Sequence, residues 1–462
     1  MEYDIKGFGG VKVKQDDLLY HPTDLFNLAK YEESFENSYR VNYTAENLSD
    51  KNGPYRINIV GNTEDYIDTR NIDLSMKFKY KKGDTGVTYH DVSLVNLICS
   101  SIFDSVQVDI NGKPMTDLTQ EEFGYKTYLQ KILSTDVCKL GTIAREYFAF
   151  DDAGTYAMDA VWKDFDSETP VATVTKSRIT DEARLYGVWL RRAVFATNGE
   201  FQVYTSLSID CLQAGRLFPP NTSITLTFKK KPQAFYMLGK VANMNTFSLE
   251  VQDMKLSVPF FHLKPELKLY QDRFLQSQPY TVPFDKCIPI RKQFGVGMSD
   301  LSYDNMITGE IPKHICAILV ETASYDGDYA RSPYCFQHCF VESVSLRINN
   351  RPYPSDMIMC DFEHENYAEQ YNFALRNTGC GGNNKGHLVG YSEYAKDYTH
   401  FPFDFSPEKC NGFHFHPIEQ GNVDLKIKLR KGLTKSMTLL VFASYNKVIS
   451  FDKNRDVKVI SI

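Results

Sequence analysis

The sequence contains no run of about 20 apolar residues, the length that an α-helix needs to cross a membrane. Residues 1–7 also lack the apolar core of a secretion signal. We therefore expect a soluble chain that is made in the cytosol and has no membrane span. Its ten cysteines are scattered over 462 residues, too sparsely for a disulfide scaffold, so we expect them to be reduced.

The sequence also lacks a strong excess of positive charge. Its formal net charge is −6, which argues against a protein whose whole surface coats nucleic acid. Only two residues are tryptophan, whereas 29 are tyrosine and 31 are phenylalanine. Strands and subunit interfaces both favour aromatic residues, so this composition is typical of a β-protein that assembles, and equally of an aromatic-rich core.

The metal-binding motifs in the sequence are incomplete. His414 and His416 with Glu419 resemble the metal motif of cupins, but the glutamate spacing differs and the first half of the chain has no counterpart. Cys335 and Cys339 have the spacing of a ligand pair, but no second pair follows at the distance of a zinc site. We expect structural or exposed histidines and buried cysteines here, and no metal site.

Catalytic motifs are missing as well. Residues 379–386 are rich in glycine but lack the Lys-Ser/Thr ending of a phosphate-binding loop. The Gly-x-Ser-x-Gly motif of α/β-hydrolases does not occur. The sequence therefore predicts no catalytic residues and no cofactor.

One segment, in contrast, occurs twice. Residues 103–114 and 341–352 align at an offset of 238 residues. Solenoid repeats recur about every 20–50 residues, so this spacing indicates a duplicated domain. An Asn-Gly pair between alternating apolar residues is a strong hairpin signal, and Asn-Asn can replace it because Asn tolerates positive φ. The hairpin residues are Val106, Ile110, Asn111 and Gly112 in the first copy, and Val344, Ile348, Asn349 and Asn350 in the second.

Each hairpin is followed by apolar residues at helical spacing, which predicts one short helix in each copy. Alternation with period two predicts matching strands at 224–230 and 423–429. These strands have an offset of 199, whereas the helices have 242, so the first copy carries about 40 extra residues, which we place within 134–186. The helix residues are Tyr125, Leu129 and Leu133 in the first copy, and Tyr367, Tyr371 and Leu375 in the second.

These features predict an all-β chain of two tandem β-sandwiches with one short helix in each copy and long loops, which is consistent with two eight-stranded jelly rolls, a double jelly roll. Residues 1–50 are polar and weakly periodic, which predicts an N-terminal arm. The first jelly roll is predicted at 51–262, with its insertion loop at about 134–186, and the second at 263–462. We expect a linker near residues 262–272.

The motifs around both hairpins resemble the major capsid proteins of Polinton/Maverick elements and adintoviruses, over about residues 55–457. The chain has Ser332, Pro333 and Tyr334 where that family usually has Asn-Pro-Phe, and its first-half insertion is longer. The matching segments of the first half are 61–68, 73–77, 95–103 and 106–112. Those of the second half are 309–313, Tyr325 with Gly327, 332–336, His338, the hairpin, Tyr367 with Tyr371, and 446–455.

This resemblance implies a double jelly-roll viral major capsid protein of the lineage shared with adenovirus hexons and tectivirus capsids, and not an enzyme. Such proteins form homotrimers, whose six lobes make a pseudo-hexagonal capsomer that tiles an icosahedral shell around a dsDNA genome. The implied partners are the chain itself, neighbouring capsomers, penton and minor capsid proteins, and indirectly the packaged DNA. The implied location is the virion, with assembly in the host cytoplasm or nucleus.

Under this interpretation the hairpins and helices are structural. The insertion is expected to be an outward tower or an inter-subunit clasp, and the arm to run along the inner face to neighbouring capsomers. Three alternatives stay open: a jelly-roll lectin, a cupin-like metal-binding protein that uses His414, His416 and Glu419, and a minor capsid or penton-type protein. Pentons are usually single jelly rolls, so the duplication counts against the last of these.

Overall fold

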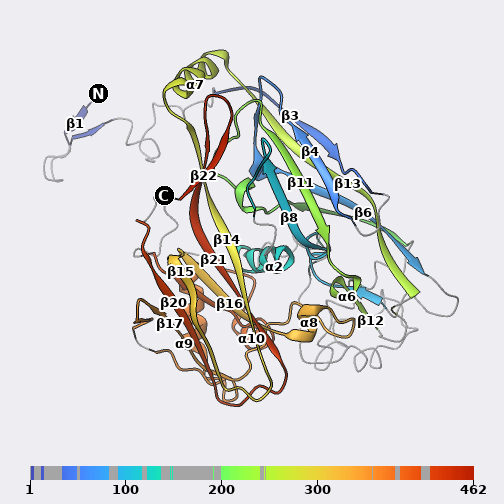
Figure 1. The fold of residues 1–462 in the computed structure, drawn as a ribbon, viewed down its shortest axis with the longest axis vertical. Helices are drawn as coiled ribbons and strands as arrows, with labels where there is room; N and C mark the ends of the chain where they lie inside the picture. Colours follow the sequence, from blue (N-terminus) through green and yellow to red (C-terminus); the bar gives the residue numbers. More distant parts are fainter. Residues whose placement is uncertain are drawn as a thin grey trace.

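The computed structural model describes residues 2–4, 12–14, 34–48, 53–82, 92–116, 122–136, 146, 148, 191, 199–239, 244, 246–355, 357–379, 386–406 and 417–461. Most of the predicted arm and most of the predicted insertion at 134–186 lie outside these residues, as do His414 and His416. Two β-sandwiches follow one another along the chain, and Figure 1 shows the α2 helix between them. The all-β double jelly roll expected from the sequence is confirmed.

The first sandwich consists of two antiparallel sheets with four main strands each. One sheet has the order β10-β6-β13-β3, and short strand β5 also pairs with β13. Its strands are β3 (Phe35–Thr44), β5 (Tyr66–Ile67), β6 (Asp73–Lys82), β10 (Glu200–Ser206) and β13 (Phe247–Leu263). The other sheet has the order β4-β11-β8-β9, made of β4 (Tyr55–Val60), β8 (Phe103–Ile110), β9 (Lys113–Pro114) and β11 (Ser223–Lys230).

The second sandwich repeats this arrangement strand for strand. One sheet has the order β14-β21-β16-β19, with the C-terminal strand β22 also paired to β21. Its strands are β14 (Tyr280–Phe294), β16 (His314–Glu321), β19 (Phe401–Asp404), β21 (Met437–Phe451) and β22 (Val457–Ser461). The other sheet has the order β15-β20-β17-β18, made of β15 (Asp300–Glu310), β17 (Val341–Ile348), β18 (Arg351–Tyr353) and β20 (Gln420–Leu429).

Short elements connect these sheets. The helical ones are η2 (Thr69–Asn71), α1 (Ile98–Ser101), α2 (Phe123–Ser134), η8 (Asp210–Leu212), α6 (Gln233–Tyr236), α7 (Pro265–Ser277), α8 (Thr322–Asp326), α9 (Ala368–Asn377) and α10 (Tyr391–Ala395). Two small sheets pair β7 (Val92–Leu94) with β12 (Met237–Gly239), and β1 (Glu2–Asp4) with β2 (Lys12–Lys14). In the described part of the chain, no helix is both long enough and apolar enough to cross a membrane.

The predicted helices are present as α2 and α9, but two other segments differ from expectation. Residues 35–44, predicted to be part of the arm, form β3 and supply the eighth strand of the first sandwich. Nearly every side chain of β3 is exposed, so its sequence lacks the alternation that would have revealed it. The expected linker near 262–272 is the end of β13 followed by α7, a helix with no buried residue.

The duplication extends to the cross-strand register. Ile110 of β8 pairs with Ile224 of β11, and the equivalent Ile348 of β17 pairs with Val423 of β20. The alternate residues of β8 and β11 are buried, as their period-two pattern predicts. Both hairpins therefore place the same sequence positions on the core side of the sheet.

An asparagine closes each hairpin sheet in the same way. Asn111 and Asn349 have φ angles of 49° and 50°, a left-handed conformation that Asn tolerates better than most residues. The Oδ1 atom of Asn111 accepts a hydrogen bond of 2.7 Å from the backbone N–H of Ser223. The Oδ1 atom of Asn349 accepts one of 3.0 Å from the backbone N–H of Asn422. Each side chain thus fastens its turn to the start of the neighbouring strand.

We predict that Asn349→Ala lowers the free energy of unfolding by about 1–3 kcal/mol, because it removes a hydrogen bond and puts Ala in the left-handed region. Asn349→Gly should lose less, since Gly adopts this φ freely and only the hydrogen bond is lost. Equilibrium urea unfolding of both variants measures the difference. Equal stability of the Asn349→Ala variant and the wild-type protein would show that the side chain does not fasten the turn.

Candidate functional site: the seam between the sandwiches

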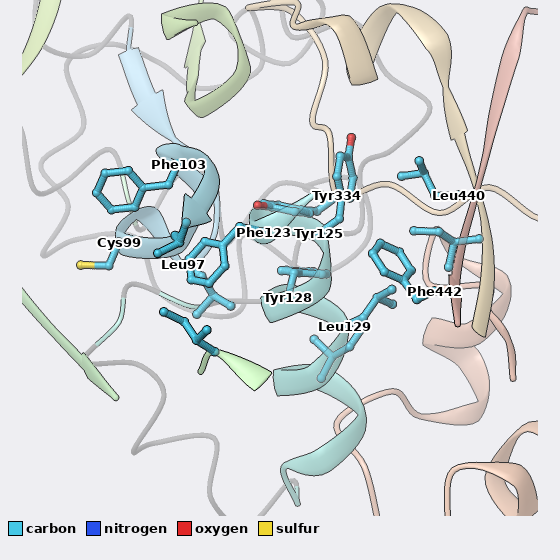
Figure 2. Close-up of a cluster of buried hydrophobic side chains, with 14 of the residues drawn as sticks. Leu97, Cys99, Phe103, Phe123, Tyr125, Tyr128, Leu129, Tyr334, Leu440 and Phe442 are labelled. Carbon is cyan, nitrogen blue, oxygen red and sulfur yellow. The ribbon is translucent and has the colours of Figure 1, made fainter. Parts of the chain in front are cut away.

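The two sandwiches share one continuous hydrophobic core, and the α2 helix lies at its centre. We call the surface where α2 and its neighbours contact the second sandwich the seam. Figure 2 shows that α2 directs aromatic and aliphatic side chains toward residues of the second sandwich. From α2 these are Tyr125, Tyr128 and Leu129, and from the second sandwich Tyr334, Leu440 and Phe442.

Stacked aromatic rings form the middle of the seam. The rings of Tyr128 and Tyr334 are 4.1 Å apart and almost parallel, with an interplanar angle of 7°. Phe336 packs edge-on against Tyr128 at 5.7 Å. The hydroxyl of Tyr334 lies 2.6 Å from the hydroxyl of Ser101, so its polar end has a partner inside the core. Burial raises the pKa of Tyr334, which therefore stays neutral.

Gly124 allows this close packing. A Cβ atom at this position would lie 3.0 Å from the hydroxyl oxygen of Tyr334 and 3.4 Å from the Cα of Ser101. The start of α2 can therefore approach both Tyr334 and α1 only because residue 124 has no side chain.

A row of polar side chains crosses the seam beside the rings. Glu122 accepts a hydrogen bond from the Tyr325 hydroxyl of α8, and its other oxygen lies 3.1 Å from the Lys231 ammonium of the first sandwich. Arg291 of β14 donates to the Tyr325 oxygen at 2.7 Å. Burial and the nearby Glu122 carboxylate raise the pKa of Tyr325, so this hydroxyl remains a donor. Through the Tyr325 hydroxyl, this row connects Glu122 and Lys231 of the first sandwich to Arg291 of the second.

A crevice of about 350 Å³ opens along α2, between this helix and β14. Within it Lys126 forms an ion pair of 2.7 Å with Asp210. The same carboxylate accepts a 2.7 Å hydrogen bond from the backbone N–H of Cys287 in β14. Because one acidic group binds both α2 and the second sandwich, this side of the seam is also fixed by polar contacts.

Further contacts join the sandwiches away from α2. Asn111 donates through its side-chain amide to the backbone oxygen of Arg455 at 2.8 Å, so the first hairpin touches the turn before β22. Tyr280 donates to the backbone oxygen of Leu217 at 2.8 Å. The rings of Phe218 and Phe451 meet at 5.5 Å. The sandwiches are therefore held in one relative orientation by several separate groups of contacts.

The residues singled out from the sequence fall in two places. The hairpin residues belong to the sheets of their own sandwiches, and Asn111 also contacts Arg455 of the second sandwich. Tyr125 and Leu129 of α2 are buried in the seam, and Leu133 packs at its edge. In contrast, Tyr367 and Tyr371 pack around α9 against Tyr394 of the second sandwich itself. The two equivalent helices therefore make different contacts, and Leu375 of α9 is half-buried.

Sequence reasoning did not identify the partners of α2 across the seam. Tyr325, Tyr334 and Arg291 lie more than 150 residues away from α2, so no local periodicity connects them to it. The only signal was the placement of Tyr325 and Tyr334 inside motifs of the family resemblance.

The described residues offer no metal site at the positions considered in the sequence. Within the described ranges, no group of three or more His, Cys, Asp and Glu side chains is placed to hold a metal ion. Cys335 and Cys339 are free thiols, and burial raises the pKa of Cys339 to about 12. A thiol with this pKa is a poor metal ligand at neutral pH. Glu419 is described, but its candidate partners His414 and His416 are not.

Comparison with known proteins shows a fold shared with viral capsid proteins. A chain of the Sputnik virophage matches with a TM-score of 0.66 at 13% identity, covering 98% of this chain and 93% of that one. A chain of the PBCV-1 virus capsid matches with a TM-score of 0.55 at 10% identity, covering 95% and 99%. The Faustovirus major capsid protein matches with a TM-score of 0.53 at 8% identity, covering 96% and 95%.

Similarity in sequence is weaker. No family model matches the chain. An uncharacterized protein of Caenorhabditis elegans is 22% identical over 278 residues, which cover 57% of this chain and 64% of that protein. The matched part thus spans less than two thirds of that relative. These comparisons establish the double jelly-roll fold and leave the activity to be inferred from the molecule.

We predict that Tyr334→Ala lowers the free energy of unfolding by about 3–5 kcal/mol, because it leaves a cavity at the centre of the seam. Tyr334→Phe keeps the stacked ring and should cost only about 1 kcal/mol, from loss of the bond to Ser101. Tyr204→Ala, on the half-exposed outer side of β10, is the matched control. Urea unfolding that gave equal losses for Tyr334→Ala and Tyr204→Ala would contradict a central role for the seam.

Proposed function

We propose that this chain is a viral major capsid protein that forms a homotrimeric, pseudo-hexagonal capsomer. The observation that carries the proposal is that two jelly rolls of equal strand order are joined by an extensive buried seam into one unit. A trimer of such a unit has six similar lobes, a shape that can tile an icosahedral shell. The structural similarity to the Faustovirus major capsid protein and the PBCV-1 capsid chain supports this function.

We further propose a place for the chain among the Polinton/Maverick elements and adintoviruses, with a dsDNA genome inside the shell. The motif resemblance supports this placement, and so does a sequence relative in an animal, Caenorhabditis elegans. In this proposal the chain acts in the virion after assembly in the host cytoplasm or nucleus. Its partners are other copies of itself, penton and minor capsid proteins, and indirectly the DNA, and its role is structural rather than enzymatic.

The first test is the solution mass of the purified protein by light scattering, with negative-stain images of the same fraction. We expect three times the chain mass of 53.0 kDa, about 159 kDa, and particles with a hexagonal outline. A stable monomer at high concentration, with glycan binding or bound metal, would favour the lectin or cupin-like alternative instead. A monomer that becomes a trimer when a second viral protein is added would still support the capsid function.

The N-terminal residues and the long insertion are proposed to mediate assembly. We place the first jelly roll at 51–262 together with β3, the second at 263–462, and the arm before β3.

The insertion is anchored where described residues flank it: Phe148 packs on Tyr128, and buried Arg191 donates to the backbone oxygen of Leu94 at 2.7 Å. Deleting residues between these two anchors tests its role, since loss of the trimer indicates a clasp and an unchanged trimer an outward tower.

A truncation series separates the arm from the sandwich. Removing residues 1–33 spares β3, so we expect a folded, trimeric protein that assembles shells poorly. Removing residues 1–44 also deletes β3, which pairs with nine residues of β13, and should reduce thermal stability as well. Calorimetry and electron microscopy of both variants measure the two effects. Normal shell assembly by the shorter truncation would rule out a role of the arm between capsomers.

A further inference from the structure

Two buried histidines face each other in the second sandwich. His387 lies in the segment between α9 and α10, and His400 immediately precedes β19. Their side chains are 4% and 0% exposed, and their ring centroids are 5.7 Å apart. The pair therefore sits in the core, where water does not screen any charge that it acquires.

The hydrogen bonds of the two imidazole rings indicate which of their nitrogens carry a proton. His400 Nδ1 lies 2.9 Å from the backbone oxygen of Tyr398, so Nδ1 carries the proton of the neutral ring. His400 Nε2 and both ring nitrogens of His387 have no hydrogen-bond partner among the described residues. A proton added to His400 Nε2 would thus be buried without an acceptor, whereas a proton on His387 would be stabilised only in part, by the backbone of His387 and Val389.

No negative charge contacts the pair from the described elements packed around it. Tyr371 of α9 lies 6.2 Å from His387, and Tyr394 of α10 lies 5.3 Å from His400, measured between rings. Burial raises the pKa values of both tyrosines, and those of Cys316 and Cys360 beside Tyr394 to about 12, so all four groups are neutral.

Two carboxylates lie near these elements. The Glu393 carboxylate contributes to the raised pKa of Tyr371. A carboxylate oxygen of Asp136 would lie 3.5 Å from a Cβ atom added to Gly386. Neither makes an ion pair with the two histidines in the described part of the chain. Protonation of one ring would therefore place an uncompensated charge in the core, and protonation of both would add repulsion between them.

The segment that carries His387 is also part of the seam. The backbone N–H of Leu388 donates to the backbone oxygen of Ile132 at 2.9 Å, which caps the end of α2. The backbone oxygen of Val389 accepts from the Tyr371 hydroxyl at 3.0 Å. A charge on His387 would therefore act directly on the contact between α2 and the second sandwich.

We propose that His387 and His400 form an acid-triggered switch that releases residues 386–389 from the end of α2 and loosens the seam. If the chain forms capsomers as proposed above, this release would soften the shell in an acidic compartment; that consequence rests on the proposed function. The switch itself is a property of the single chain, so it can be tested without assembly.

The direction of the pH dependence follows from proton linkage. Burial lowers the pKa of His400 from 6.5 to about 4 and also lowers that of His387. Above pH 6.5 both rings are neutral in the closed and the open state, and the seam has its full stability. As the pH falls from 6.5 toward 4, the open state binds protons before the closed state does, so opening becomes more favourable. For His400 alone, these values give about thirtyfold more opening at pH 5 than at pH 7.5.

Hydrogen exchange of the purified chain at pH 7.5 and pH 5.0, corrected for the intrinsic rates, tests the proposal. We expect at least tenfold faster corrected exchange at pH 5.0 in peptides that contain residues 386–389 and the end of α2. Peptides from β8 should change much less. No local change in the wild-type protein would overturn the proposal, whatever the oligomeric state of the chain.

Two variants and a control assign the effect to these histidines. His387→Phe removes a titrating ring that has no hydrogen bond to lose, and His400→Asn can still donate to the Tyr398 oxygen. Each should reduce the acid-induced change several-fold. His338→Gln is the control, because His338 also has a pKa of about 4 but lies beside Phe362, before β17. Unchanged acid sensitivity in both the His387→Phe and the His400→Asn variants, or loss of acid sensitivity in the His338→Gln control, would contradict the assignment.

Discussion

The burial of the α2 helix between the two sandwiches is the constraint on which the rest of the structure depends. Two jelly rolls joined only by a connecting segment would turn freely relative to each other. Here α2 presents Tyr128 and Leu129 to the second sandwich, and polar contacts of Glu122 and Lys126 lie beside these side chains. This helix therefore fixes the angle between the two lobes.

Duplication explains the sandwiches but not the seam. The copies agree in strand order, in register and in the asparagine that closes each hairpin. They differ in the helix that follows, because α2 packs on the other sandwich whereas α9 packs on its own. A symmetric pair of helices could not both occupy the single space between the lobes. The divergence of the second helix is thus a requirement of joining two similar domains into one unit.

The sequence predicted the parts of the fold that local periodicity encodes. The hairpins, α2 and α9, and the strands β11 and β20 each carry their own period of hydrophobic residues. The sequence does not reveal β3, because both faces of this strand are exposed, and α7 resembles a linker in sequence because it buries no residue. The seam could not be predicted, since Tyr128 and Tyr334 are 206 residues apart and only the folded chain brings them together.

The position of β3 has a consequence for how the chain is made. β3 ends at Thr44, but its partner β13 starts at Phe247, about 200 residues later. At about 5–20 residues per second, a ribosome needs roughly 10–40 s to synthesise the intervening chain. During that time the first strand of the first sandwich has no sheet to join. Because unpaired strand edges are prone to aggregation, this delay exposes the nascent chain to association with other chains before the first sandwich can close.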